Sequence, residues 1–415
     1  MKRVVVTGIG ALTPIGNDVR GYLDGLQKGI SGANLITHFD AANFKTQFAC
    51  EIKESDFSNV IDVRESRRLD NFSIYAMVAA DEAFKASGLD VEQLNLDRCG
   101  VIWGSGIGGL RALEKEIEEF DAGNGIPRYN PFMIPKMISN LAAGHLSIKY
   151  GFRGPSYATV SACASAGHAL SSAFDYIRLG RVDVMISGGS EAAVTKAGIG
   201  GFNAMKAMST RNDDFKTASR PYDADRDGFV LGEGAGAIIL EELEHARKRG
   251  ATIYAELVGC GSTSDAYHIT APHPEGLGAS NVMRLALEDA GMNPEDIEYI
   301  NTHGTSTPLG DTAELQAVQR FFGDHSYKLN ISSTKSMTGH LLGAAGAIEA
   351  IACILAIQHN FIPPTINHFT DDPEIDPRLN LTFNTAQERK IDAALSNTFG
   401  FGGHNSATIF KRFVG

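Results

Sequence analysis

The stretch Ser156-Tyr157-Ala158-Thr159-Val160-Ser161-Ala162-Cys163-Ala164-Ser165-Ala166-Gly167 governs the interpretation of the whole chain. Residues 156–162 are mostly short or β-branched, which predicts a buried strand. Cys163 follows this strand, and apolar residues then recur at helical spacing as far as Ile177. A cysteine at such a corner lies near unpaired N–H groups and the positive end of the helix dipole, so we expect a thiolate. On this stretch alone, a buried structural cysteine is the simpler interpretation.

Composition places the 415 residues among ordinary globular proteins, with 43% hydrophobic and 21% charged residues. The formal net charge of −12 argues against a general nucleic-acid binder, because binding to phosphates requires a positive face. The five cysteines are far apart and lack C-x-x-C spacing, which indicates free thiols in a reducing compartment. A core strand rather than a signal peptide follows Met1, and no apolar run reaches the roughly 18 residues of a membrane helix. We therefore expect a cytoplasmic enzyme without a membrane contact.

Strands and helices alternate along the chain, which predicts an α/β sheet with helices on both faces. The expected strands are 4–7, 99–103, 156–162, 182–187, 236–240, 254–259, 297–302, 329–332, 379–384, 391–396 and 406–411. The expected helices, besides the one after Cys163, are 18–28, 66–87, 110–121, 134–150, 241–249, 278–290, 311–322 and 343–359. The sequence predicts loops over 196–236 and a turn of the chain at the glycine corner Gly8-Ile9-Gly10. A dinucleotide site at that corner is disfavoured, since the third glycine is missing and Pro14 follows.

Two histidines occur in similar contexts directly after predicted strands. His303 lies in N-T-H-G-T-S-T-P (301–308), and His340 ends S-S-T-K-S-M-T-G-H (332–340). Open α/β sheets place ligand sites at such strand ends, so these histidines together with Cys163 indicate a site. A metal site is disfavoured, because neither histidine has a ligand partner at helical spacing and no cluster completes the set.

A cysteine with two histidines suits chemistry that passes through two oxyanions, an acyl carbonyl and then an enolate. Neutral imidazoles donate N–H bonds to such oxygens without transferring a proton. Glu314 lies one turn into the helix 311–322 and is expected to pair with Lys335. The charge of Lys335 would keep a nearby imidazole neutral by repulsion. A routine surface ion pair is the alternative interpretation of these two residues.

Taken together, the motifs resemble the β-ketoacyl-acyl carrier protein synthase family over essentially the whole chain. The matching motifs are V-S-A-C-A-S-A around Cys163, T-H-G-T-S-T-P-L-G-D from Thr302, S-T-K-S-M-T-G-H-L-L-G-A-A-G from Ser333, and N-T-F-G-F-G-G-H-N from Asn397. Within that family, the segment Ser264–His268 and the chain length are most similar to the type II elongation synthases. His404 departs from the pattern, since many members have threonine there.

The resemblance implies a thiolase-like fold with five α-β-α-β-α layers, made of an N-terminal half (1–255) with the nucleophile and a C-terminal half (256–415) with both histidines. It implies a decarboxylative Claisen condensation between an acyl group on Cys163 and malonyl-acyl carrier protein, with no cofactor and no metal. The N–H groups of Cys163 and Phe401 would form the oxyanion hole, while His303 and His340 would assist decarboxylation. Lys335 would orient the site with Glu314, and Asp311 would support the loop of His303.

The resemblance also implies substrate and partner contacts. Phe401 would gate the acyl cavity, next to Phe399. The acyl tunnel would be lined by Phe202 and Ile107. The pantetheine arm would be held by Thr305 and Thr307. Acyl carrier protein would dock on a local basic patch of this acidic protein, and the enzyme would be a homodimer. The residues implied for that patch are Arg64, Arg67, Arg68, Arg128 and Lys206; for each one, a solvated charged face is the alternative.

Four rival functions compete with this one. A biosynthetic thiolase is disfavoured, because no second cysteine lies in the glycine-rich C-terminal loop. A chain-length subunit of a polyketide synthase generally lacks the nucleophile, which is present here, although a ketosynthase of a polyketide or other specialised pathway stays open. A non-catalytic module that binds acyl groups or carrier protein is the rival from another class.

Overall fold

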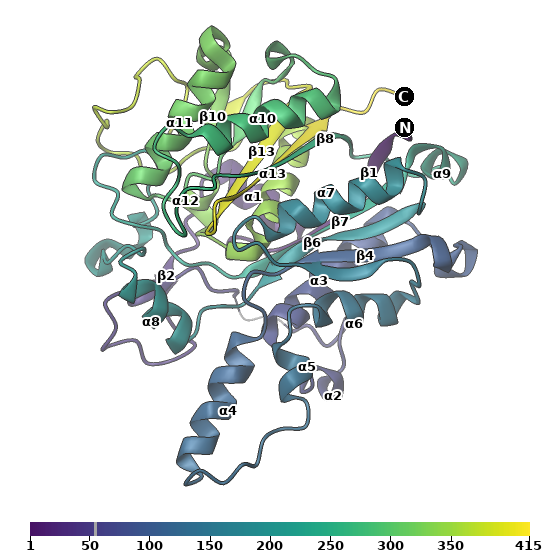
Figure 1. Cartoon of the computed structure of the whole chain (residues 1–415), viewed down its shortest axis with the longest axis vertical. Coiled ribbons are helices and arrows are strands. Elements are labelled where there is room, and N and C mark those ends of the chain that lie inside the picture. The colour runs from purple at the N-terminus through teal and green to yellow at the C-terminus, as the bar shows by residue number, and fades with distance from the viewer. Residues whose placement is uncertain (54–55) are drawn as a thin grey trace.

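The protein forms five layers in the order helix, sheet, helix, sheet, helix, and the two sheet layers are the two halves of one ten-stranded sheet (Figure 1). The computed structural model describes residues 1–53 and 56–415. The ten strands of the main sheet are β1 (Val4–Leu12), β4 (Cys99–Gly104), β5 (Ser156–Thr159), β6 (Val184–Glu191), β7 (Gly234–Glu242), β8 (Ala255–Ser264), β9 (Tyr299–Asn301), β10 (Asn330–Ser332), β13 (Ala393–Gly400) and β14 (His404–Lys411). Their order across the sheet is β10-β9-β13-β14-β8-β1-β7-β6-β4-β5.

Helices cover both outer faces and fill the space between the two halves of the sheet. The α-helices are α1 (Val19–Lys28), α2 (Val63–Ser66), α3 (Asn71–Ser87), α4 (Leu110–Ala122), α5 (Met133–Met137), α6 (Leu141–Tyr150), α7 (Ser165–Arg178), α8 (Lys196–Ala204), α9 (Leu243–Lys248), α10 (Leu277–Ala290), α11 (Pro308–Phe322), α12 (Lys335–Thr338) and α13 (Ala345–His359). Helices α3 and α6 pack outside the first half, α10 and α11 outside the second, and α7 and α13 lie between them (Figure 1). The predicted fold class is confirmed.

Strand β1 joins the two halves of the sheet. It pairs with β7 along its length, and its first residues Val4–Val6 also pair with Ala255–Leu257 of β8. The strands of the first half end with Glu242, and those of the second half begin with Ala255. Two short pairs lie outside this sheet: β2 (Asn34–Leu35) with β3 (Phe48–Ala49), and β11 (Phe361–Ile362) with β12 (Gln387–Glu388).

The strand before Cys163 differs from its prediction. It was expected to be buried over 156–162, but β5 spans only Ser156–Thr159 and forms an edge of the sheet. Tyr157 is 37% exposed and Val160 is 61% exposed. Small and β-branched residues suit a crowded core, but they suit a surface that receives another strand equally well, so composition alone could not separate the two.

The expected corner at Gly8-Ile9-Gly10 is also wrong, because β1 continues through it to Leu12, with a register shift between Val6 and Gly8. These glycines allow α3 to approach closely: a Cβ on Gly10 would lie 2.0 Å from the carbonyl oxygen of Ala79. Glycine in a strand often marks such a close approach of backbones rather than a turn.

Several predicted boundaries also shift. The helix expected over 66–87 begins only after Asp70, whose side chain caps α3 through the N–H of Phe72. The helix expected over 134–150 is broken into α5 and α6, and the loop expected over 196–236 contains α8. Residues expected as a strand over 379–384 form only isolated bridges.

Helix α13 is the most apolar element of the core. With the short turn before it, the segment Leu342–His359 has a mean hydropathy of 1.5 and is long enough to cross a membrane, contrary to the sequence expectation. However, 89% of this segment is buried between the two halves of the sheet, which accounts for its hydropathy.

Candidate active site

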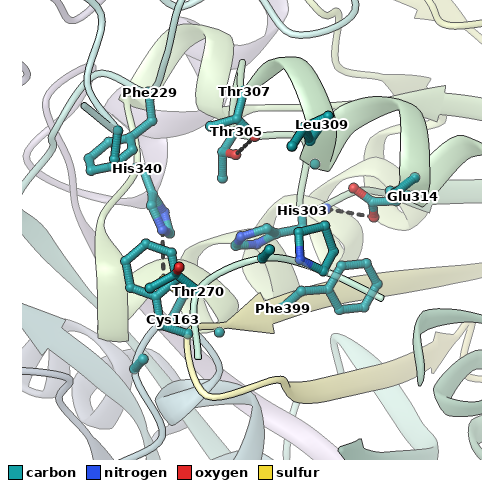
Figure 2. Close-up of a pocket in the computed structure, with 18 of the residues that line it drawn as sticks. Cys163, Phe229, Thr270, His303, Thr305, Thr307, Leu309, Glu314, His340 and Phe399 are labelled. Atoms are coloured by element: carbon teal, nitrogen blue, oxygen red, sulfur yellow. Dashed lines mark hydrogen bonds between the residues drawn. The ribbon is translucent and has the colours of Figure 1, made fainter. Parts of the chain in front are cut away.

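A cavity of about 680 Å³ opens beside Cys163 and receives residues from both halves of the chain. Figure 2 shows Cys163 and the rings of His340 and His303 directed toward one another within it. The sequence placed these residues at the ends of separate elements, and the fold brings them together. Reactive atoms of the three side chains lie within 4.8 Å of one another.

Cys163 lies between the end of β5 and the start of α7, after Ala162 with a φ of 50°. The side chain is almost fully buried, and this burial raises the pKa of the Cys163 thiol to about 12. The charge of Lys335 and the backbone N–H of Phe401 act against that rise in the pKa. The expected resting thiolate is therefore wrong: desolvation outweighs the end of the helix, and the sulfur carries its proton at neutral pH.

His340 contacts the nucleophile directly. Its Nε2 atom lies 2.9 Å from Cys163 Sγ, and the ring packs edge-on against Phe229, with centroids 5.6 Å apart (Figure 2). Burial, assisted by the charge of Lys335, lowers the pKa of His340 well below its ordinary value. A neutral imidazole beside a neutral thiol can accept the thiol proton as the sulfur attacks a carbonyl carbon.

His303 lies on the other side of the cavity, with its ring 5.2 Å from that of His340 and 5.7 Å from that of Phe399. Burial, Lys335 and His340 together lower the pKa of His303 well below its ordinary value. Both imidazoles are therefore neutral, which suits them to donate N–H bonds to a developing oxyanion.

The same three residues are close enough together to hold a metal ion. Histidine ligands of metals normally anchor the other ring nitrogen on a carboxylate or carbonyl. The Nδ1 atoms of His303 and His340 have no hydrogen-bond partner within the described part of the chain. The donor set thus fits acid–base and oxyanion chemistry better than a metal centre.

Lys335 is buried and forms an ion pair with Glu349 of α13, not with Glu314 as expected. Its Nζ also lies 3.5 Å from the carbonyl oxygen of Thr302, which precedes His303. The surface-pair alternative for Lys335 and Glu314 is also wrong, since both residues are buried. A lone carboxylate within an apolar helix was the signal in the sequence that could have identified Glu349.

Glu314 and Asp311 both hold the loop that carries His303. Glu314 accepts the backbone N–H groups of His303 and Gly304, each at 2.8 Å (Figure 2). Asp311 accepts the N–H of Thr307 at 3.3 Å and lies 3.6 Å from the guanidinium of Arg226. These two carboxylates fix the start and the end of the loop 303–307.

Replacing Lys335 with methionine should lower the free energy of unfolding by about 3–5 kcal/mol, because the change leaves the carboxylate of Glu349 buried without its partner. Denaturant unfolding measures this loss. The matched control is the double variant Lys335→Met with Glu349→Leu, which removes both charges and should recover most of the stability. Equal losses in the single and double variants would contradict the pairing.

All of the predicted substrate residues line the cavity: Ile107, Phe202, Thr305, Thr307 and Phe399. The hydroxyl groups of the two threonines are 3.1 Å apart at one wall (Figure 2). Phe202 packs against Phe229, with ring centroids 5.3 Å apart, at the apolar wall next to His340. The sequence reasoning missed Phe229 and the cavity segment that includes Thr270, because neither carries a local catalytic pattern.

Phe401 lies at the cavity within a glycine-rich turn between β13 and β14. Gly402 and Gly403 have φ values of 87° and 74°, which favour glycine. A Cβ on Gly400 would lie 2.6 Å from the carbonyl oxygen of Ser161 and 3.1 Å from the backbone nitrogen of Cys163. The absence of a side chain there lets this turn approach the nucleophile.

The residues predicted for carrier-protein docking are exposed but lie on several elements. Arg64 lies on α2, with Arg67 and Arg68 directly after it, and the guanidinium of Arg68 stacks over Phe132. Arg128 lies in the loop before α5. Lys206 belongs to the lining of the cavity itself.

Comparison with known proteins decides the family. The model for the β-ketoacyl synthase N-terminal domain matches residues 1–246, and the model for the C-terminal domain matches residues 254–369. The chain belongs to the β-ketoacyl synthase family. The cavity that joins the cysteine to both histidines therefore lies between the two parts of a ketoacyl synthase.

Relatives and solved structures agree over the full length. The chain is 49% identical over 412 residues to the 3-oxoacyl-[acyl-carrier-protein] synthase 2 of Staphylococcus aureus strain COL, and 48% identical to the protein of the same name from Coxiella burnetii, with 99% of each chain covered. A β-ketoacyl synthase structure from Burkholderia phymatum matches with a TM-score of 0.92 at 35% identity and full coverage of both chains. The ishigamide ketosynthase/chain length factor matches with a TM-score of 0.93 at 34% identity, also over both full chains.

Proposed function

We propose that this ketoacyl synthase elongates fatty acyl chains by condensing an acyl group, held as a thioester on Cys163, with malonyl-acyl carrier protein. The products are 3-oxoacyl-acyl carrier protein and CO2. The observation that carries this proposal is the buried Cys163–His340 contact of 2.9 Å, with His303 close by, in a cavity with apolar walls. Residues 1–255 then supply the nucleophile and residues 256–415 supply both histidines, as two halves of one body.

The first half-reaction transfers the acyl group. Cys163 Sγ attacks the carbonyl carbon of the acyl carrier thioester, and its proton passes to Nε2 of His340. The N–H groups of Cys163 and Phe401 stabilise the oxyanion of the tetrahedral intermediate. The intermediate collapses, the carrier thiol leaves with the proton, and the acyl group remains on the sulfur.

The second half-reaction forms the carbon–carbon bond. Once the sulfur is acylated, the neutral ring of His340 adopts the tautomer with its proton on Nε2. Malonyl-acyl carrier protein loses CO2, and the N–H groups of His303 and His340 stabilise the enolate on its thioester oxygen. The enolate carbon attacks the acyl carbonyl and expels the sulfur of Cys163 as a thiolate, which then takes up one proton from solvent. Burial, assisted by the charge of Lys335, keeps both imidazoles neutral, while Glu314 and Asp311 hold the loop of His303 in position.

A ketosynthase of a polyketide pathway is the second candidate. A chain from the complex of a type II polyketide synthase acyl-carrier protein with its ketosynthase is similar to this chain, with a TM-score of 0.89 at 32% identity. The higher identity of 48–49% to the 3-oxoacyl-[acyl-carrier-protein] synthases 2 favours fatty acid elongation.

The assembly and setting follow from the same proposal. Acyl carrier protein docks on the exposed basic residues Arg64, Arg67, Arg68, Arg128 and Lys206, of which Lys206 lines the cavity. Two copies pair through the exposed edge of β5, where Tyr157 and, directly after the strand, Val160 are exposed in the single chain. All five cysteines are free, which suits a cytoplasmic location.

The test uses the purified chain with acyl carrier protein that carries a radiolabelled acyl group. Label should appear on the protein at Cys163, and addition of malonyl-acyl carrier protein should move it into a longer 3-oxoacyl product. A chain that binds acyl carrier protein without ever taking label would be a binding module, and the proposal would fall. The same assay with short polyketide intermediates on acyl carrier protein distinguishes fatty acid elongation from the second candidate, a ketosynthase of a polyketide pathway.

Replacing Phe401 with alanine should slow acylation of Cys163 by about tenfold or more, because the ring no longer closes the cavity against water. The N–H of residue 401 stays in place, so the fold and the oxyanion contact are kept. Single-turnover transfer of label measures the rate, and thermal unfolding shows that stability is retained. Leu309→Ala, at an exposed residue of the cavity rim, is the matched control. A wild-type rate in Phe401→Ala rules out the gate.

A further inference from the structure

Glu191, the last residue of β6, is a fully buried carboxylate that the proposed mechanism does not use. Five donors surround it. The backbone N–H groups of Gly106, Gly343, Ile107 and Gly108 donate at 2.7, 3.0, 3.1 and 3.3 Å, and the hydroxyl of Ser105 donates at 3.2 Å. Carboxylate oxygens accept several such bonds at once, so both oxygens are fully engaged.

The donors belong to two turns that are more than two hundred residues apart in sequence. One turn, 105–108, follows β4, and the other contains Gly343, three residues after His340. The two turns touch: a Cβ on Gly343 would lie 2.2 Å from the backbone nitrogen of Gly106 and 2.7 Å from the carboxylate of Glu191. Glu191 is thus the shared hydrogen-bond acceptor around which both turns close.

Each turn supplies one apolar residue to the wall of the cavity, Ile107 from the first and Leu342 from the second. The backbone nitrogen of Ile107 is bonded directly to Glu191. Leu342 has a φ of 46°, a conformation that non-glycine residues keep only when their surroundings impose it, and its neighbour Gly343 is bonded to the same carboxylate.

We propose that Glu191 is a positioning residue that determines acyl chain-length selectivity by fixing Ile107 and Leu342 on the cavity wall. This inference rests on the proposed function. Shape discrimination against a single methylene is worth roughly 10- to 200-fold in kcat/KM when the walls of a pocket are held in place. If the two turns become mobile, Ile107 and Leu342 can move apart, and the preference for one acyl chain length weakens.

The variant Glu191→Gln tests this proposal. The amide replaces one acceptor oxygen with an NH2 group, so at least two of the N–H donors lose their acceptor while the side-chain volume is unchanged. We measure kcat/KM for a series of acyl carrier proteins with short, medium and long acyl chains. The ratio between the preferred and the least preferred chain should fall by about tenfold or more. A ratio of two rates on one preparation is unaffected by the fraction of folded enzyme.

The matched control is Glu82→Gln. Glu82 is also a largely buried carboxylate that accepts two backbone N–H groups, those of Ala11 and Val19, but it lies away from the cavity. This control should reproduce any general loss of stability and leave the selectivity ratio unchanged. If Glu191→Gln does not fold, Ser105→Ala removes one donor to the same carboxylate and should weaken selectivity in the same direction.

The two levels of failure are distinguishable. A wild-type chain that elongates no acyl carrier substrate overturns the proposed function. A wild-type chain that elongates with a preference, together with a Glu191→Gln variant whose rates fall equally for all chains, overturns only the role of Glu191 in selectivity.

Discussion

Replacing Cys163 with alanine should abolish acyl transfer, with a loss on the order of a millionfold, which is the effect of removing the nucleophile from other acyl-transfer enzymes. Decarboxylation of malonyl-acyl carrier protein should survive, because His303, His340 and the cavity are unchanged. Transfer of radiolabel to protein measures the first activity, and release of CO2 measures the second.

The control for this experiment is Cys260→Ala, which removes another free cysteine at a position outside the cavity. That variant should take label at the wild-type rate. Label retained by Cys163→Ala would assign the nucleophile to another residue. Loss of both activities in Cys163→Ala would contradict the division of work between the sulfur and the histidines.

Replacing either histidine with alanine should reduce malonyl decarboxylation by about 10²- to 10³-fold, the usual effect of removing one donor to an oxyanion. The two variants should differ in acylation. His340 lies in contact with Cys163 Sγ, so His340→Ala should also slow transfer of the acyl group, since the thiol loses its proton acceptor. His303→Ala should leave acylation close to the wild-type rate.

Glutamine gives the matched comparison at each position, because its amide N–H can reach approximately where Nε2 lies but cannot act as a base. His303→Gln should keep more decarboxylation than His303→Ala, while His340→Gln should still acylate slowly. Unchanged CO2 release in the alanine variants would remove the histidines from the second half-reaction. Equal acylation rates in His303→Ala and His340→Ala would contradict the role of His340 as the proton acceptor for the Cys163 thiol.

Burial separates what could be predicted about the site from what could not. Cys163, His303 and His340 were identified from their positions after strands and from family motifs, since these features are local in the sequence. The protonation of Cys163 was predicted wrongly, because local sequence indicates the nearby helix end but not the desolvation imposed by the surrounding residues. The ion-pair partner of Lys335 was also missed, because Glu349 lies on another helix and meets Lys335 only in the folded protein.

The fold shows the same division. Alternating apolar segments were enough to predict an α/β protein with helices on both faces, and the bounds of α1 and α10 were predicted to within one residue. The positions of glycines within β1 and the exposed edge at β5 depend on which element packs beside them, and that is not encoded in any single segment.

The sequence alone determined the family motifs, the general alternation of strands and helices, and the residue types of the nucleophile and its two histidines, because these follow from local pattern. Only the tertiary structure decided that the thiol is neutral, that Lys335 pairs with Glu349, and that Glu191 closes two distant turns around the cavity. Each of these depends on desolvation and on contacts between residues far apart in the chain, and both arise only when the chain is packed.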